Sequence, residues 1–213
     1  MQQTNVLASS PRKAQWPFAL LWGVLGLMVG VGSAWAVAGG LFGAGKTVVG
    51  GWASDPMVGA QAANPWLRAR IARVGLLGLT KSETLYFERN HDDDGAPLRE
   101  TCRYRLSGSN LPARWWSVTL YGSDQYLARN TDMAPSIDAT RVAATGKEQW
   151  SAIVASKAPT DGNLWLSSRA GGRFSLTLRL YNPNMLNLDE LAKYSFPKIE
   201  RISCDAAGGG VTP

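Results

Sequence analysis

The sequence has few charged residues, one histidine and two cysteines, and each shortage excludes a class of site. Charged residues make up 18% of the 213 residues, against roughly 25% in typical soluble domains. The single histidine, His91, excludes zinc sites with two or three histidine ligands, and two cysteines alone do not make a structural zinc site. The sequence therefore predicts no zinc site and no histidine-based catalytic residues; no cofactor and no metal are expected.

The shortage of charge is concentrated in one segment. No Asp, Glu, Lys, Arg or His occurs between Lys13 and Lys46. Residues 16–38 (WPFALLWGVLGLMVGVGSAWAVA) lie in this gap and exceed the roughly 20 residues that cross a bilayer as a helix. We expect a transmembrane helix at 16–38, with the lipid bilayer as its partner. A signal peptide cleaved before Gly39 is the alternative, although its apolar region usually has only about 7–15 residues.

The charges beside this segment predict its orientation. Arg12 and Lys13 precede it, and Lys46 is the only charge after it before Asp55. Because cytoplasmic flanks carry the excess of positive charge, residues 1–15 are expected to be a cytoplasmic tail. The prediction is a single-pass protein of the inner (cytoplasmic) membrane, with its C-terminal domain in the periplasm.

The formal net charge of +6 overstates how basic the exported part is. Arg12, Lys13 and Lys46 flank the apolar segment, and the remaining basic residues only slightly outnumber the 16 acidic ones. Nucleic-acid-binding domains concentrate Lys and Arg in a stripe, and the sequence contains no such run. Nucleic acid is therefore excluded as an expected partner.

The chain after the apolar segment begins with a predicted linker and a predicted helix. Residues 39–63 are Gly-rich and aperiodic, which is typical of a linker. A helix is expected from Asn64, because Leu67, Ile71 and Val74 then fall on one face. This basic amphipathic helix either lies on lipid headgroups or packs on the domain that follows.

From residue 83 onward the hydrophobic period changes to two. In residues 173–183, for example, Phe174, Leu176, Leu178 and Leu180 alternate with polar side chains. Strands are expected at 83–89, 99–108, 114–122, 148–156, 163–168, 173–183 and 198–204. Short strands with one apolar face favour a mainly β, antiparallel sandwich at 64–204, with residues 205–213 as a flexible tail.

An ordered string of motifs resembles the domain-of-unknown-function 1214 family. The motifs are ETLYFERNHDDDGAPL, CRYRLSG, LPARWWSVTLYG and GRFSLTLRLYNP, within about Pro65 to Cys204. The resemblance implies a jelly-roll-like β-sandwich. It also implies kinship with proteins that often occur beside a sister family, domain of unknown function 1254, so a member of that family is a possible partner. It implies no chemistry. The segment NLWLSSRAGG departs from the family's Asn-Trp-Leu-Pro, because Leu164 intervenes and Ser167 replaces the proline.

Two short patterns resemble ligand-binding loops. GLFGAGKT, residues 40–47, fits the phosphate-binding pattern, but a phosphate loop joins a strand to a helix and this segment follows an apolar helix. Nucleotide binding is therefore not expected. NHDDDG, residues 90–95, fits the first half of a calcium loop, but Thr101 stands where the closing Glu is required. We expect a solvated hairpin turn there, with a weak metal site as the alternative.

The two cysteines and several strand residues remain as candidate functional groups. Cys102 and Cys204 are predicted either to form a disulfide, in an oxidising compartment, or to be buried free thiols. Outward-facing arginines beside aromatic rings suit a carboxylate, a phosphate or a sugar ring if their strands are neighbours. The candidate ligand-binding residues are Arg103, Arg105, Trp115, Tyr121, Arg179 and Tyr181. An ordinary outer sheet face is the alternative.

The sequence as a whole favours a binding or accessory module of the cell envelope. Its partner is expected to be another envelope protein, a glycan or a lipid headgroup. An envelope hydrolase that works without histidine is a second possibility. A structural subunit of a membrane complex is a third, since Gly26 and Gly30 have the spacing of a helix-pairing motif.

Overall fold

The computed structural model describes residues 16–38, 46–55, 57–60, 62–63, 65–73 and 77–205. The chain divides into two compact units, Met1–Phe42 and Gly43–Pro213. The predicted N-terminal tail, the motif residues 39–45 and the tail beyond Asp205 lie outside the described residues.

The described residues of the first unit form the helix α1 (Trp16–Ala38). Its residues 16–36 are long and apolar enough to cross a membrane, a property that signal sequences near an N-terminus share. The large side chains of α1, such as Trp22, Leu27 and Val31, are exposed within this unit. Exposed apolar side chains over this length are the pattern expected of a helix whose solvent is lipid.

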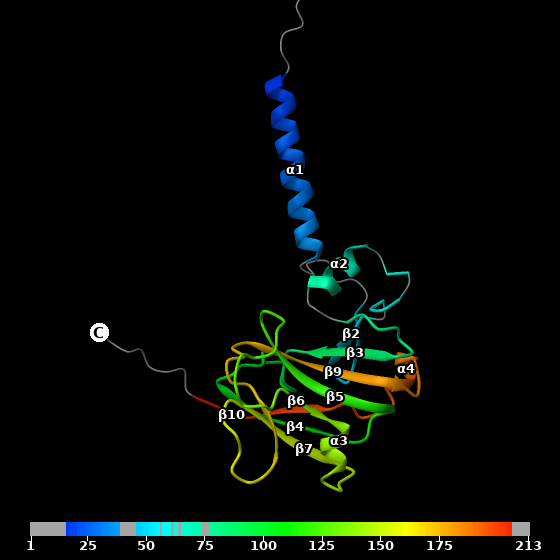
Figure 1. The fold of residues 1–213 in the computed structure, drawn as a ribbon, viewed down its shortest axis with the longest axis vertical. Coiled ribbons are helices and arrows are strands. Elements are labelled where there is room, and N and C mark those ends of the chain that lie inside the picture. Colours follow the sequence, from blue (N-terminus) through cyan, green and yellow to red (C-terminus); the bar gives the residue numbers. More distant parts are fainter. Residues whose placement is uncertain are drawn as a thin grey trace, which may run out of the picture. The chain divides into compact units, whose positions relative to one another are not determined.

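The second unit is a mainly β fold of two sheets, as the sequence predicts (Figure 1). The six-stranded sheet has the order β1-β2-β3-β9-β5-β6 and the four-stranded sheet the order β10-β4-β7-β8. The strands of the first are β1 (Thr47–Val49), β2 (Trp52–Ser54), β3 (Thr84–Arg89), β5 (Ala113–Gly122), β6 (Ser136–Asp138) and β9 (Phe174–Pro183). Those of the second are β4 (Cys102–Gly108), β7 (Trp150–Ala155), β8 (Leu164–Ser167) and β10 (Lys198–Cys204). The described helices of this unit are α2 (Pro65–Arg73), α3 (Ala139–Ala143) and α4 (Leu188–Leu191).

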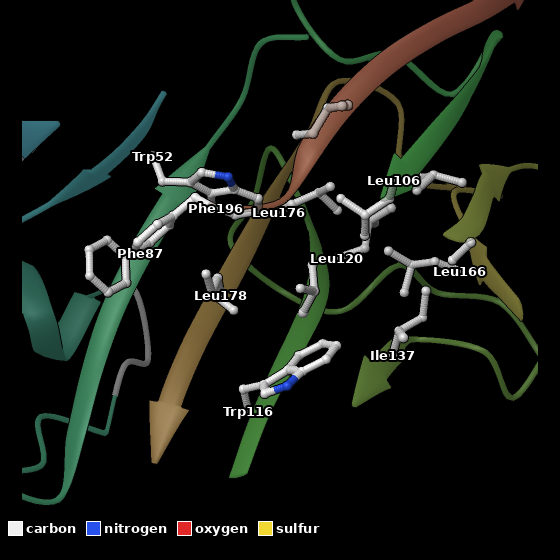
Figure 2. Packing of buried hydrophobic residues seen from close by; sticks show 14 of the residues in the cluster. Trp52, Phe87, Leu106, Trp116, Leu120, Ile137, Leu166, Leu176, Leu178 and Phe196 are labelled. Carbon is white, nitrogen blue, oxygen red and sulfur yellow. The ribbon is translucent and has the colours of Figure 1, made fainter. Parts of the chain in front are cut away.

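The core lies between the two sheets and follows from the alternation of the strands. Leu176, Leu178 and Leu180 of β9 are fully buried, while Thr177 and Arg179 between them face outward. Figure 2 shows Leu176 and Leu178 beside Leu120 and Trp116, with Leu106 and Leu166 of the other sheet across from them. Because side chains alternate in a strand, burying one face of β9 fixes its other face as an outer surface.

Two sequence predictions need correction. Residues 47–54 are not part of a linker, because β1 and β2 form a hairpin that joins β3. The hairpin turns at Gly50 and Gly51, both with positive φ, and it buries Trp52, whose Nε1 donates to the carbonyl of Pro197 at 2.8 Å. Its strands are too short to show a period. The sandwich is also not wholly antiparallel, since β7 and β8 run parallel.

Candidate functional site

The six predicted ligand-binding residues fall on two different sheets. Trp115 and Tyr121 lie on β5, and Arg179 and Tyr181 on its neighbour β9. Arg103 and Arg105 lie on β4, which pairs with β10 and β7 in the other sheet. The condition for a shared face therefore fails for this second group. Arg105 instead donates to Glu200 of β10 at 2.8 Å in an exposed ion pair.

Arg179 is held between two tyrosine rings on the outer face of the six-stranded sheet. Its Nη2 donates to the hydroxyl of Tyr121 at 2.7 Å. Its guanidinium carbon lies 5.3 Å from the centroid of the Tyr121 ring and 5.9 Å from that of Tyr86. Tyr86 belongs to β3 and is opposite Arg179 in the register. Strands β3, β9 and β5, adjacent in Figure 1, thus position one cation between two aromatic rings.

A second aromatic pair lies beside Arg179. Trp115 and Tyr181 are register partners, and their ring centroids are 5.2 Å apart. The indole Nε1 of Trp115 donates to Thr140 Oγ1 in α3 at 3.0 Å, which fixes the ring. Both rings keep part of their surface exposed. The pair therefore offers apolar area without leaving the indole N–H unpaired.

Small hydroxyl side chains form the floor between these large residues. Ser117 is opposite Arg179, Thr119 is opposite Thr177, and Ser175 is opposite Tyr121; all three hydroxyl side chains are buried. We call Tyr86, Trp115, Ser117, Tyr121, Arg179 and Tyr181 the Arg179 face. Tyr86 was not among the predicted ligand-binding residues, although the alternation of the predicted strand 83–89 places its side chain on the outward face.

No carboxylate forms an ion pair with Arg179 among the residues that the structure describes. Glu88 lies on the same outer face, opposite Thr177. Asp138 is opposite Ser117, but its carboxylate caps α3 by accepting from Arg141 N at 2.9 Å. The guanidinium has five N–H donors, so donors of Arg179 remain for an anionic group.

The hydroxyl of Tyr86 is not an anion at neutral pH. Burial raises the pKa of Tyr86 above its ordinary value of 10.0, although Arg179 acts in the opposite direction. The protonated hydroxyl donates to the carbonyl of Leu77. Tyr86 therefore supplies a ring, and not a countercharge, to Arg179.

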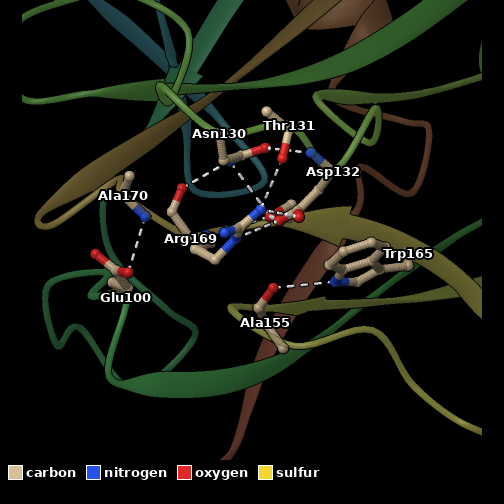
Figure 3. A network of polar contacts seen from close by, with 9 residues as sticks. Glu100, Asn130, Thr131, Asp132, Ala155, Trp165, Arg169 and Ala170 are labelled. Carbon is tan, nitrogen blue, oxygen red and sulfur yellow. Dashed lines mark hydrogen bonds and ion pairs between the residues drawn. The ribbon is translucent and has the colours of Figure 1, made fainter.

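A second polar cluster pins the loop after β5 to the loop after β8. Asp132 accepts from Ser167 Oγ at 2.6 Å and from Arg169 Nε at 2.9 Å, with a further bond from Arg169 Nη2. Asn130 Nδ2 donates to the carbonyl of Arg169 at 2.7 Å. Figure 3 shows Arg169 surrounded by Asn130, Thr131 and Asp132. We call Asn130, Asp132, Ser167 and Arg169 the Asp132 clamp.

The Asp132 clamp is internally neutral. Its Arg169 and Ser167 hydrogen bonds hold the pKa of Asp132 below its ordinary value of 3.8, and Asp132 in turn raises the pKa of Arg169. Ser167, in the position of the family's proline, is buried and uses its hydroxyl proton on Asp132. The clamp therefore satisfies its own charges and fixes two loops.

The acidic turn at residues 90–97 is a hairpin whose carboxylates are already paired. Asp92 Oδ1 accepts from the amides of Asp94 and Ala96. Arg89 pairs with Asp93 at 2.6 Å, and Arg201 lies 3.4 Å from Asp92 Oδ2. Within the described residues, no group of three or more His, Cys, Asp or Glu is arranged to hold a metal ion.

The structure favours neither a catalytic role for His91 nor nucleotide binding by the phosphate-loop pattern. His91 is exposed, and its Nδ1 lies 2.7 Å from Oδ1 of the neighbouring Asn90. Thr47, the last residue of GLFGAGKT, begins strand β1. A phosphate loop needs a helix N-terminus at this point, and β1 does not provide one.

Cys102 and Cys204 lie at disulfide distance. They are directly opposite each other on β4 and β10, with their Cα atoms 3.9 Å apart. The pair joins residues 102 positions apart in the sequence. It ties the last strand of the described chain to the centre of the four-stranded sheet.

One solved structure similar to this chain shows the same fold. The crystal structure of the VPA0106 protein from Vibrio parahaemolyticus is 21% identical, with a TM-score of 0.52, and the match covers 67% of this chain and 36% of that one. A putative uncharacterized protein from Burkholderia cenocepacia is 15% identical, with a TM-score of 0.42, over 56% of this chain and 29% of that one. This chain thus spans about a third of the length of the Vibrio protein. No curated protein matches it.

The family comparison covers most of the sandwich. Residues 83–185, from β3 to just beyond β9, match the family described as "Protein of unknown function (DUF1214)". The matched segment contains every residue of the Arg179 face and of the Asp132 clamp. The match confirms, over residues 83–185, the resemblance to this family that the sequence motifs predict.

Proposed function

We propose that this protein is a membrane-tethered binding module of the cell envelope that holds an anionic ligand on the Arg179 face. One observation carries the proposal. Arg179 is half-buried between two aromatic rings and has no ion-pair partner in the described chain. Burying a charge without a partner is unfavourable, whereas a carboxylate or phosphate would form charge-assisted hydrogen bonds with the guanidinium.

Two further features support the envelope location. Helix α1 has the length and composition of a membrane span, and the flanking charges favour a cytoplasmic N-terminus. Disulfides persist in oxidising compartments such as the periplasm, and Cys102 and Cys204 are placed to form one. In this proposal α1 stays in the inner membrane and the sandwich lies in the periplasm.

The proposal is tested on the full chain, extracted in detergent from native membranes and examined by native mass spectrometry. Wild type is compared with Arg179→Gln and with Arg105→Gln, which removes an exposed arginine from the other sheet. We expect a bound molecule on wild type and on R105Q, and its loss from R179Q. Equal occupancy of all three proteins, or no bound molecule on wild type, would overturn the proposal.

A capture experiment from the same extract tests the partner class. If a second envelope protein, such as a member of the 1254 family, accounts for all R179-dependent mass, the ligand of the Arg179 face is a protein and not a small anion. A small molecule on the isolated chain is the result that the proposal expects.

A further inference from the structure

The cation and the aromatic pair of the Arg179 face are immediate neighbours. Arg179 and Tyr181 are two residues apart on β9, so they face the same side with Cα atoms roughly 7 Å apart. On β5, Ser117 is opposite Arg179 and Trp115 is opposite Tyr181. A ligand whose charge lies on Arg179 therefore has the Trp115–Tyr181 rings directly beside it.

The charges around Arg179 are distributed unevenly. Glu88 is opposite Thr177, which precedes Arg179 on β9, whereas Tyr181 follows it. The carboxylate of Glu88 thus lies on the side away from the aromatic pair. An anion that approaches Arg179 meets less repulsion from the Tyr181 side.

The other carboxylates near the aromatic pair have partners of their own. Glu83, which comes just before β3, accepts from both the amide and the hydroxyl of Thr80. Asp138 accepts from Arg141 N at the start of α3. Neither of them competes for the guanidinium of Arg179.

We propose that the ligand is a sugar that carries a carboxylate. This inference rests on the proposed function and specifies its ligand. The carboxylate accepts from Arg179, whose fork of donors fits it. The ring packs its C–H surface on Trp115 and Tyr181, which keep exposed apolar area for it.

Three matched probes separate the two halves of this site. D-glucuronate carries both the ring and the carboxylate, D-glucose only the ring, and acetate only the carboxylate. Binding to the full chain in detergent is measured by saturation-transfer NMR on the probe. We expect glucuronate to bind at least about tenfold more tightly than either glucose or acetate, which corresponds to one good contact from each half.

Variants assign each half to its residues. Arg179→Gln is expected to remove the preference for glucuronate over glucose, and Trp115→Ala the preference over acetate. Arg105→Gln is the control and retains both preferences. Because W115A also removes the contact to Thr140, Tyr181→Ala provides an independent test of the ring half, and thermal unfolding confirms that each variant is folded.

The outcomes distinguish this inference from the proposed function. In one outcome, glucuronate binds no better than glucose and acetate while an R179-dependent molecule is still found on the native protein. That result overturns the proposal of a carboxylated sugar and leaves the proposed binding module in place. A phosphate-bearing lipid as that molecule likewise overturns the sugar and leaves the module. If no R179-dependent molecule is found and no probe binds, both proposals fail.

Discussion

Arg169 and Arg179 are ten residues apart in the sequence and have opposite relations to acidic groups. Arg169 forms an ion pair with Asp132, which also accepts from Ser167. Among the residues that the structure describes, Arg179 has only the hydroxyl of Tyr121 as hydrogen-bond acceptor. The Asp132 clamp is therefore complete without a ligand, whereas the Arg179 face has donors to spare. An arginine that has no carboxylate partner within the described chain is therefore the better candidate for binding an anion.

The largest expected effect is on ligand binding at the Arg179 face. Arg179→Gln keeps hydrogen-bonding capacity but removes the positive charge, so we expect affinity for an anionic ligand to fall at least about thirtyfold, the equivalent of one charged hydrogen bond. The melting temperature should stay within about 3 °C of wild type. Isothermal titration on the full chain and thermal unfolding measure the two quantities. A large loss of stability with binding intact would make Arg179 structural.

The next effect is on stability at the Asp132 clamp. Asp132→Ala leaves Ser167 and Arg169 without their shared acceptor, so we expect the melting temperature to fall by about 5 °C. The matched control is Asp124→Ala, because Asp124 lies 4.0 Å from Arg129 in an exposed pair. A similar drop in both variants would show that the clamp is no stronger than an ordinary surface ion pair.

The pH dependence of stability should also come from the clamp. The pKa of Asp132 is lowered in the folded chain, chiefly by Arg169. Its contribution is therefore fully present above the ordinary value of 3.8 and is lost as pH falls through the lower folded value. We expect the difference in melting temperature between wild type and D132A to shrink as pH falls below about 3.8. A difference that stays constant down to about pH 2 would contradict this.

The smallest effect tests the tyrosine beside Arg179. Tyr121→Phe keeps the ring and removes the hydroxyl that accepts from Arg179. We expect a loss of about 1 kcal/mol in the free energy of unfolding, typical of one hydrogen bond. Ligand affinity should change by less than about threefold, because the cation remains. Chemical denaturation and titration of Y121F against wild type measure both.

The sequence predicted those parts of the fold that depend on local periodicity. The alternation of Phe174, Leu176, Leu178 and Leu180 placed Arg179 and Tyr181 on one outer face, and the structure has this arrangement. The spacing of Leu67 and Ile71 predicted the helix found as α2. The period of a strand or helix determines which face of that element a side chain lies on, and this does not depend on which elements pack beside it.

The sequence did not predict which elements become neighbours. Arg103 and Arg105 have the same alternation as Arg179, yet β4 belongs to the other sheet. Asp132, in the loop after β5, meets Ser167, at the end of β8, across 35 positions of the sequence. Strand order and loop contacts arise from packing over the whole domain, so a single strand's pattern does not contain them. The hairpin of β1 and β2 was missed because each of its strands has only three residues, too few to show a period.

The most direct test measures ligand occupancy and melting temperature together in two variants of the full chain, Arg179→Gln and Arg169→Gln. We predict that R179Q loses the bound molecule with its melting temperature nearly unchanged. R169Q should melt several degrees lower and keep the molecule. The reverse pattern, in which R169Q loses the molecule and R179Q loses stability, would contradict the assignment of a binding role to Arg179 and a structural role to Arg169.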